Sequence, residues 1–378
     1  MVDSNMDHLA FIVHWLDVQA GVTWKYQLTY HASDKSLEMY DIKNRRTFLK
    51  RTEYPSVKPE HLYIGSIITV YSRQLHLMDY ADEHTRKKLD QKRETTLAMI
   101  KPDAIEHIGK ILNAIYGSGF LIKRMKMCHL SLTEAQQFYA VHQARPFFRT
   151  LTEFMSSGRV FAMELVTENA IAKWRKLIGP TNSDTARAED PDSLRANFGT
   201  DNTMNACHGS DAPETAKQEV SFFFDRADVG RCAQLRDCSL AIVKPHAVTA
   251  GHAGAIIDQI AAHFEITALQ QHILDQANAV EFLEVYKGVV PEYNGLVDEL
   301  KSGPLIALEV TSRDGSPDVV QELREFCGPA DPEIGKVLRP QSLRAQFGID
   351  KVKNAVHCTD LPEDGPLESN FFFDILLS

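Results

Sequence analysis

The chain has 378 residues, of which 44% are hydrophobic and 24% are charged, and its formal net charge is −10 at pH 7. This length is sufficient for two or three domains with separate cores. The acidic balance argues against broad binding to nucleic acid or to an anionic membrane, because both would need a basic face. Six cysteines without a CxxC pair are typical of a reducing compartment, so we expect a cytoplasmic location.

The first 90 residues predict a small antiparallel β domain of PH-like type. The apolar run LAFIVHWL (9–16) is too short for a membrane span and lacks the basic flank of a signal peptide. Alternation in TWKYQLTY places four large side chains on one face: Trp24, Tyr26, Leu28 and Tyr30. The charged stretch at 84–94 reads as a linker or a connecting helix.

From residue 91 onward, strands and helices alternate. LAMIK (97–101) reads as a buried strand, and apolar residues at helical spacing predict a helix from Ile108 to Gly117. LIKRMKMCHL (121–130) alternates like a strand, and the next helix begins at a capping box. The strand RVFAMELV and the helix ENAIAKWRKLIG follow. This βαββαβ order predicts an α/β sandwich of ferredoxin-like type.

The same order of motifs occurs twice. NACHGSD (205–211) returns as NAVHCTD (354–360), each preceded at equal distance by LRANFG or LRAQFG and followed by FFFD. Such ordered repetition predicts a tandem duplication, with one ferredoxin-like domain over 91–232 and another over 233–378. The FFFD strings read as an edge strand or as C-terminal core residues.

Polar residues of the first repeat indicate a polyphosphate site. Four of them supply hydrogen-bond donors: Lys101, Arg175, Arg195 and Asn205. The sequence contains no GxxxxGK[ST] and no GxGxxG before a helix, so the site is neither of Walker nor of Rossmann type. His208 can act as a nucleophile near pH 7 without prior deprotonation. We therefore expect phosphoryl transfer through His208, stabilised by the cations and by bound Mg²⁺.

These motifs resemble those of the nucleoside diphosphate kinases. The resemblance covers the whole of each repeat and is carried by KPDA (101–104), RPFF (145–148), IGPTN (178–182), LRANFG (194–199) and NACHGSD (205–211). It implies a ping-pong exchange of γ-phosphates between ATP or GTP and nucleoside diphosphates, with Mg²⁺ as cofactor bound mainly through the phosphates. It also implies broad base specificity, since stacking does not depend on base identity.

The resemblance implies a role for each matching position. His208 would be phosphorylated, and Ser210 and Glu219 would orient its ring. Phe147 would stack on the nucleobase, with Leu151 beside it. The implied phosphate and ribose contacts are Lys101, Tyr139, Arg175, Thr181, Arg195 and Asn205. Tyr139 and Leu151 also lie at helical spacing, which leaves a core role open for both.

A β-rich module followed by two such repeats is similar to one subgroup of this family. The N-terminal module of that subgroup, the DM-ten domain, recurs in proteins of ciliary doublet microtubules. The resemblance implies a location in the cytoplasm and cytoskeleton, at the axoneme of the cilium or flagellum, the centrosome and the spindle. It implies tubulin and the γ-tubulin ring complex as partners. A structural role in doublet microtubules, or regulation of that complex, with little required catalysis stays open as the alternative.

The second repeat keeps six of the implied site residues: Lys244, Arg324, Arg344, Asn354, His357 and Glu368. Other positions differ. Leu283 replaces the tyrosine unless Tyr286 takes its place, and Ala330 replaces the threonine. Tyr293 is the candidate for base stacking, and Thr359 keeps the hydroxyl of Ser210. Each lost hydrogen bond to a charged group costs about 1.5–3 kcal/mol, so two losses would slow transfer about a hundredfold. The sequence leaves open whether His357 turns over.

Overall fold

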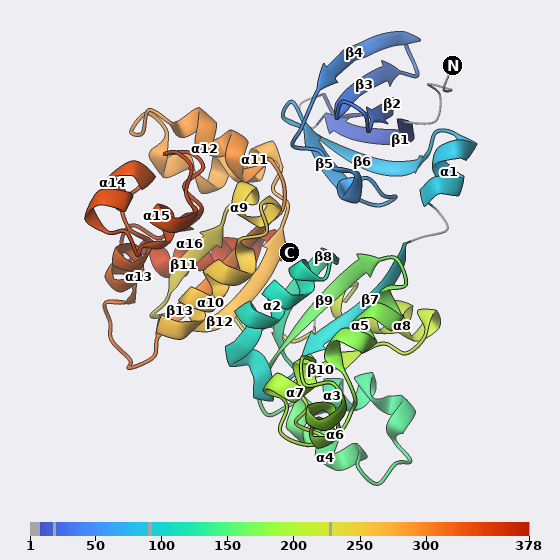
Figure 1. The fold of residues 1–378 in the computed structure, drawn as a ribbon. Helices are drawn as coiled ribbons and strands as arrows, with labels where there is room; N and C mark the ends of the chain where they lie inside the picture. The colour runs from blue at the N-terminus through green and yellow to red at the C-terminus, as the bar shows by residue number, and fades with distance from the viewer. Residues whose placement is uncertain (1–7, 18–19, 90–92, 227–228, 378) are drawn as a thin grey trace. The chain divides into compact units, whose positions relative to one another are not determined.

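The computed structural model describes residues 8–17, 20–89, 93–226 and 229–377 (Figure 1). By their contacts these residues form two compact units, an N-terminal unit that ends at Arg93 and a larger unit that holds almost all of both repeats.

The N-terminal unit is an antiparallel sheet with strand order β4-β3-β2-β1-β6-β5. Its elements are β1 (His8–Asp17), β2 (Val22–His31), β3 (Ser36–Asp41), β4 (Arg46–Glu53), η1 (Pro59–His61), β5 (Ile67–Val70), β6 (Arg73–Tyr80) and α1 (Glu83–Leu89). Leu28 and Tyr30 are buried in its core, and Trp24 packs against the edge of that core. The predicted small antiparallel β domain is confirmed. Helix α1 includes residues 84–89 of the charged stretch, of which residues 90–92 lie outside the described residues.

The first repeat forms four antiparallel strands in the order β10-β7-β9-β8. Its elements are β7 (Glu94–Ile100), η2 (Pro102–His107), α2 (Ile108–Gly117), β8 (Leu121–His129), α3 (Leu132–Phe138), η3 (Ala140–His142), α4 (Phe148–Met155), β9 (Arg159–Thr167), α5 (Ala170–Ile178), α6 (Ser183–Glu189), α7 (Leu194–Phe198), β10 (Cys207–Gly209) and α8 (Pro213–Phe224). The fourth strand thus lies beside the first, which is the predicted ferredoxin-like arrangement. Ser131 and Glu134 form the predicted capping box of α3.

The second repeat continues the same sheet in the order β12-β13-β11-β14. Its elements are β11 (Ser239–Val243), α9 (Pro245–Thr249), α10 (Ala253–His263), β12 (Phe264–His272), α11 (Gln276–Phe282), η4 (Glu284–Tyr286), α12 (Tyr293–Leu300), β13 (Leu305–Ser312), α13 (Val319–Cys327), α14 (Pro332–Leu338), α15 (Leu343–Phe347), β14 (Val356–Cys358), α16 (Asp364–Phe373) and η5 (Ile375–Leu377). The duplication predicted from the motifs is therefore a duplication of structure.

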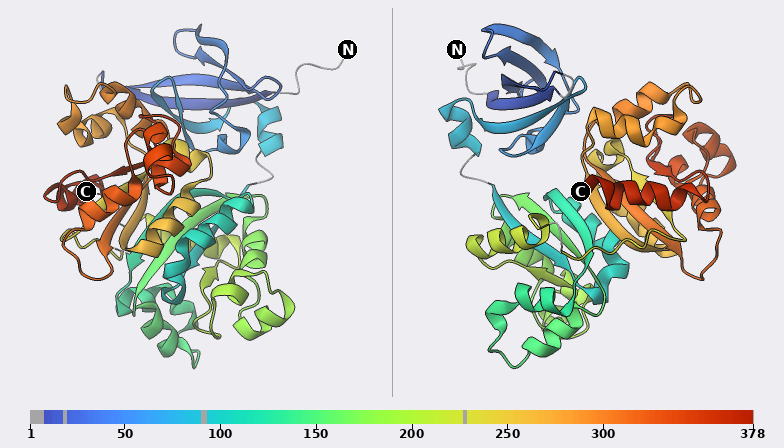
Figure 2. Two further views of the ribbon diagram at one scale, coloured as in Figure 1. Left: turned by 60° about the vertical axis from the view of Figure 1, so that its left-hand side comes forward. Right: turned by 180° about the vertical axis from the view of Figure 1, so that it is seen from behind.

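The two repeats pair within one chain. Strand β8 lies next to β12, so eight strands form one sheet (Figure 2). Helices α2 and α10 meet on one face, where a Cβ on Gly109 would lie 2.3 Å from the backbone nitrogen of Asp258. A Cβ on Gly254 would likewise lie 2.3 Å from the side-chain oxygen of Asn113. Each glycine thus faces the helix of the other repeat, as in a two-fold interface.

Of the two alternatives for the FFFD strings, the edge strand is wrong and the core role is confirmed. The FFFD strings lie on helices α8 and α16 and on no edge strand. Their phenylalanines still serve the core, since Phe223 and Phe372 are fully buried. A run of three aromatic residues has no polar alternation, so the sequence alone does not separate a buried strand from a buried helix here.

Candidate active site

A strained turn positions His208. His208 lies on β10, and Ala206, two residues before it, has a φ of +63°. Across Ala206 the Cys207 N–H donates to the Asn205 carbonyl at 2.6 Å, which makes a γ-turn of the rare strained kind. The Ala206 N–H donates to Asp103 at 3.0 Å. This carboxylate holds the turn in a conformation that alanine alone would avoid.

Glu219 of α8 fixes the ring of His208. One carboxylate oxygen lies 2.9 Å from Nε2 of His208, and the other accepts from the Ser210 hydroxyl at 2.6 Å. Ser210 Oγ itself accepts from the Leu97 N–H at 3.2 Å. Because Nε2 faces a carboxylate, it carries the proton and Nδ1 keeps its lone pair. The arrangement therefore presents Nδ1 as the ring nitrogen open to an electrophile.

The ammonium group of Lys101 lies buried beneath the loop that precedes His208. It donates to Oδ1 of Asn205 at 2.7 Å and to the carbonyl of Thr203 at 3.0 Å. The Asn205 amide donates to the carbonyl of Thr181 at 2.8 Å. Burial, with the charge of Arg195 nearby, lowers the pKa of Lys101 to about 8. The lysine thus stays largely charged at neutral pH while it ties the loop together.

Three of the residues expected to contact phosphate share one cavity of about 300 Å³: Arg175, Thr181 and Arg195. Arg195 donates to the carbonyls of Gly179 and Cys207 at 2.8 and 2.9 Å, and its buried Nε has no partner among the described residues. The side chain of Arg175 makes no hydrogen bond or ion pair within the described part of the chain. Two guanidinium groups at one cavity favour an anionic ligand.

Tyr139 is buried against His208. The two rings meet edge-on with their centroids 5.9 Å apart. The Tyr139 hydroxyl has no hydrogen-bond partner among the described residues, and burial raises its pKa. A buried hydroxyl without a partner is unfavourable, so an oxygen of a ligand would satisfy it.

Phe147 is 48% exposed, whereas Leu151 packs into the core with Tyr139. His142 links the two aromatic residues, since its ring lies 6.4 Å from that of Tyr139 and 5.7 Å from that of Phe147. The exposed ring of Phe147 offers a face for stacking on a planar ligand. Leu151 has the core role that the sequence left open.

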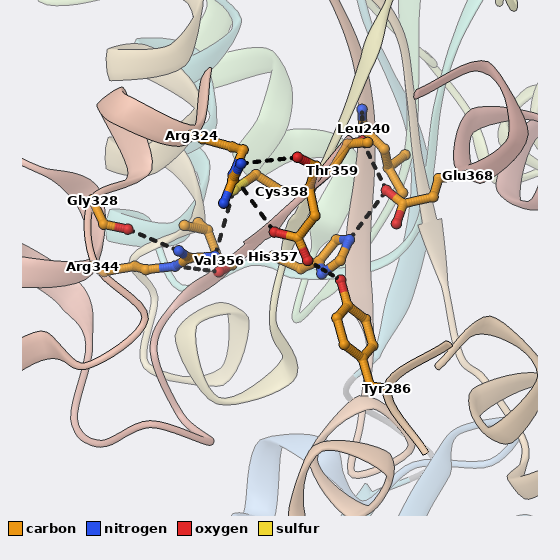
Figure 3. A network of polar contacts seen from close by, with 11 residues as sticks. Leu240, Tyr286, Arg324, Gly328, Arg344, Val356, His357, Cys358, Thr359 and Glu368 are labelled. Atoms are coloured by element: carbon orange, nitrogen blue, oxygen red, sulfur yellow. Dashed lines mark hydrogen bonds and ion pairs between the residues drawn. The ribbon is translucent and has the colours of Figure 1, made fainter. Parts of the chain in front are cut away.

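The second repeat builds the same centre around His357 (Figure 3). Nε2 of His357 lies 3.2 Å from Glu368, and Thr359 donates to that carboxylate at 2.8 Å. Thr359 also accepts from the Leu240 N–H at 2.9 Å. Threonine therefore makes both contacts that Ser210 makes in the first repeat.

In the second repeat, the side chain of Tyr286 lies where the side chain of Tyr139 lies in the first repeat. Leu283 directly follows α11 as Tyr139 directly follows α3, but Leu283 is a buried core residue. The ring of Tyr286 instead meets His357 edge-on at 6.5 Å, and Figure 3 shows it across the imidazole from Glu368. Of the two alternatives that the sequence left open, the structure supports the shift to Tyr286.

Arg344 and Lys244 of the second repeat also donate to backbone carbonyls. Arg344 donates to the carbonyls of Gly328 and Val356 at 2.8 and 3.1 Å, in the manner of Arg195. Lys244 donates to the carbonyl of Val352 at 2.9 Å, and burial, with Arg344 nearby, lowers its pKa to about 7.

The second repeat does not reproduce the link between lysine and asparagine. The Asn354 amide donates to the carbonyl of Ala330 at 3.0 Å, as the equivalent amide does in the first repeat. The buried Oδ1 of Asn354 has no partner among the described residues. This part of the second site is therefore less well satisfied than its counterpart.

Cysteines also distinguish the two sites. Cys358 follows His357, and its Sγ lies 3.5 Å from Arg344. A hydrogen bond from Cys327, and then the charge of Arg344, lower the pKa of the Cys358 thiol. In the first repeat, burial raises the pKa of Cys207 to about 12, so that thiol is unreactive at neutral pH.

The second repeat has the same γ-turn, since Ala355 has a φ of +69° and the Val356 N–H donates to the Asn354 carbonyl at 2.9 Å. Sequence reasoning missed the residues that hold these two turns. Asp103 does so in the first repeat, and His246 does so in the second. His246 Nε2 accepts from the Ala355 N–H at 3.2 Å, while its Nδ1 donates to Glu299 at 2.7 Å. A polar residue directly after each strand-ending Lys-Pro was the available signal.

Two further observations bear on cofactors and membranes. Within residues 8–17, 20–89, 93–226 and 229–377, no cluster of three or more His, Cys, Asp or Glu side chains is suited to a metal ion. No helix in the described part of the chain is long and apolar enough to cross a membrane.

Known proteins share both the motifs and their order. The sequence profile described as "Nucleoside diphosphate kinase" matches residues 94–229 and 237–375, and "Nucleoside diphosphate kinase 7 N-terminal PH domain" matches residues 3–91. The chain is 49% identical over 379 residues to "Nucleoside diphosphate kinase homolog 7" of Rattus norvegicus and 47% identical to that of Mus musculus. Each alignment covers 99% of this chain and 94% of the relative. "Nucleoside diphosphate kinase" of Aquifex aeolicus is 49% identical over 138 residues, which are 36% of this chain and 97% of that protein.

Proposed function

The chain belongs to the nucleoside diphosphate kinase family, and on this basis we propose that its first repeat transfers the γ-phosphate of a nucleoside triphosphate to a nucleoside diphosphate through His208. The observation that carries this proposal is the contact of Glu219 with Nε2, which leaves Nδ1 of His208 as the nucleophile. The Tyr139 hydroxyl and Nε of Arg195 are donors that have no partner among the described residues, and both residues lie near the same ring.

Each half-reaction exchanges one bond. Nδ1 of His208 bonds to the γ-phosphorus while the bond from that phosphorus to the bridging oxygen breaks, and the nucleoside diphosphate leaves with the electron pair. A terminal oxygen of a second nucleoside diphosphate then takes the phosphoryl group, and the neutral imidazole returns. Glu219 keeps the proton on Nε2 throughout. Lys101, Arg175 and Arg195 offset the charge on the phosphoryl oxygens, and Mg²⁺ bound through the phosphates would supply further neutralisation.

A labelling experiment tests this function. Wild-type protein incubated with γ-labelled ATP and Mg²⁺ should acquire an acid-labile, alkali-stable label, and a nucleoside diphosphate should discharge it. His208→Ala should remove at least about nine-tenths of the label, because the first site is the better equipped of the two. The proposal fails if wild-type protein acquires no label, or if His208→Ala leaves the label unchanged.

We further propose a cytoskeletal role, at ciliary microtubules, the centrosome and the spindle, for the N-terminal domain, with tubulin and the γ-tubulin ring complex as partners. The supporting observation is a set of exposed basic side chains on and beside edge strand β4: Lys43, Arg45, Arg46, Lys50 and Arg51. A basic edge suits an acidic surface such as that of tubulin.

Microtubule co-sedimentation tests this second role. The double variant Arg45→Glu/Arg46→Glu should lose most of the sedimented protein, whereas His208→Ala should sediment like wild type. Tagged versions of both variants, followed in ciliated cells, should differ in location in the same way. A charge-reversed protein that still binds and localises normally would refute this role for β4, and wild-type protein that neither sediments nor localises would refute it altogether.

A further inference from the structure

The two repeats differ at the place of the exposed Phe147. Phe147 directly precedes α4, and its carbonyl accepts the Leu151 N–H at 2.9 Å. Glu292 directly precedes α12, and its carbonyl accepts the Leu296 N–H at 3.0 Å. Glu292 is therefore the backbone equivalent of Phe147, and a carboxylate stands where the first repeat presents a ring.

The residue expected to stack in the second repeat is placed elsewhere. Tyr293 is the first residue of α12, which makes it equivalent to Phe148. Both side chains pack against the cores of their repeats. Tyr293 is thus unsuited to replace Phe147, because its ring already serves the core.

A lysine connects Glu292 to a second carboxylate. Nζ of Lys351 lies 4.0 Å from Glu292 and 3.8 Å from Asp331, which caps α14. The first repeat has uncharged residues at both equivalent positions, namely Asn202, six residues before its histidine, and Asn182, which caps α6. In the second repeat an ionic bridge therefore runs from the start of α12 to the start of α14.

In the second site, two side chains at the place expected to bind phosphate are already bonded to Asp360 of the same chain. Asp360 accepts from the Tyr286 hydroxyl at 2.5 Å. Arg324 donates to the Asp360 carbonyl at 3.0 Å and lies 3.6 Å from its carboxylate. The equivalent Arg175 has no such partner within the described residues. A ligand of the second site would therefore have to displace Asp360 before it could use both donors.

From this difference we infer that Glu292 and Lys351 set the ligand specificity of the second site by excluding a nucleobase. The inference rests on the proposed function of the first site. A base that entered here would meet a carboxylate in place of an aromatic ring, and it would have to separate Lys351 from two carboxylates. Stacking on an aromatic ring contributes affinity for any base. Without stacking, the second site contacts only the phosphates of a nucleotide. His357 therefore accepts a phosphoryl group from a nucleotide no more readily than from a base-free polyphosphate.

Exchange of two residues tests the inference. In a His208→Ala background, label on His357 is measured against the concentration of γ-labelled ATP, with and without Glu292→Phe/Lys351→Asn. The exchange should lower the ATP concentration for half-maximal labelling about tenfold or more, the range that stacking on one ring supplies. Unlabelled ADP and tripolyphosphate should compete about equally before the exchange, and ADP should compete better after it. Lys351→Asn alone, which only removes the bridge, should give a smaller shift in the same direction.

The reciprocal exchange is the matched control. In a His357→Ala background, Phe147→Glu/Asn202→Lys should raise the ATP concentration needed to label His208 about tenfold or more, and tripolyphosphate should then compete as well as ADP. Thermal unfolding of all variants within a few degrees of their parents excludes misfolding as the cause.

Three results would overturn the inference. The first is parental His357 that is labelled at the same ATP concentration as His208. The second is a folded exchange variant with no change in half-maximal concentration. The third is absence of label on His357 in both proteins, since the lost base contact would then not be what separates the two sites. The second and third outcomes are read on His357 alone, whereas label at His208 in wild type tests the proposed function separately.

Discussion

Lys101 is the residue whose protonation should set the upper pH limit of the first site. Burial and Arg195 lower its pKa to about 8, from an ordinary value of 10.5. Above pH 8 the free protein loses the ammonium charge that attracts phosphate. With His357→Ala as background, kcat/KM should therefore fall about tenfold per pH unit above that value, since kcat/KM reports the free enzyme.

The stability of the fold should rise with pH over the range in which kcat/KM falls. Between about pH 8 and 10.5 the unfolded chain binds more protons at this lysine than the folded chain does, so the free energy of unfolding rises with pH. Lys101→Gln should be slower at pH 7 by about ten- to a hundredfold, and it should lose both pH effects. A kcat/KM that stays level from pH 7 to 9 in the parent protein would contradict the assignment.

Glu219 should act on the rate more than on nucleotide affinity. It contacts His208 and Ser210 and no residue of the cavity at Arg175. Glu219→Ala removes the acceptor for Nε2, so the ring can rotate or take the other tautomer, and kcat should fall about ten- to a hundredfold. KM should change less than threefold. Steady-state kinetics in the His357→Ala background measure both, and a loss confined to KM would assign Glu219 to binding instead.

At the scale of the element, the γ-turn stores strain that glycine would release. A φ of +63° at Ala206 costs about 1–2 kcal/mol for a residue with a Cβ, and glycine avoids this at a smaller cost in chain entropy. Ala206→Gly should therefore raise the free energy of unfolding by about 0.5–1 kcal/mol, or the Tm by about 2 °C. Phosphorylation of His208 should become slower because the loop is less rigid.

The matched control for that substitution is Ala188→Gly, on the exposed side of α6. Alanine there has ordinary helical geometry, so glycine should lower stability by about 0.5–1 kcal/mol. If both substitutions lower the Tm equally, the turn at Ala206 stores no strain.

Local sequence rules were sufficient to predict much of the fold and of the first site. The capping box at Ser131 and the strand-and-helix periodicity depend on neighbouring residues only, and the repeated motifs fixed the domain order. Register across an insertion could not be predicted in the same way. The segment from Leu283 to Glu292 is one residue longer than the segment from Tyr139 to Phe147, and within it Tyr286 takes the place beside His357. Such shifts depend on packing against distant elements.

At the scale of the whole molecule, the close approach of α2 and α10 joins the two kinase repeats. A Cβ on Gly109 would lie 2.3–2.5 Å from the backbone nitrogen, Cα and Cβ of Asp258, and backbone atoms cannot move aside as a side-chain tip can. Gly109→Ala should therefore push the helices apart and expose part of the shared core. We expect a loss of at least about 2 kcal/mol in stability, the usual scale of a forced overpacking.

Gly117, on the same helix, provides the control for this change. Nothing lies within 4 Å of its Cβ position, so Gly117→Ala should raise stability by about 0.5–1 kcal/mol. Calorimetry should show one cooperative transition for the two kinase repeats in this control and in wild type, and two separated transitions in Gly109→Ala. Protease should then cut the segment between the repeats, at residues 229–238, faster in Gly109→Ala than in wild type. One unchanged transition in Gly109→Ala would mean that the sheet pairing of β8 with β12, and not the helix contact, unites the repeats.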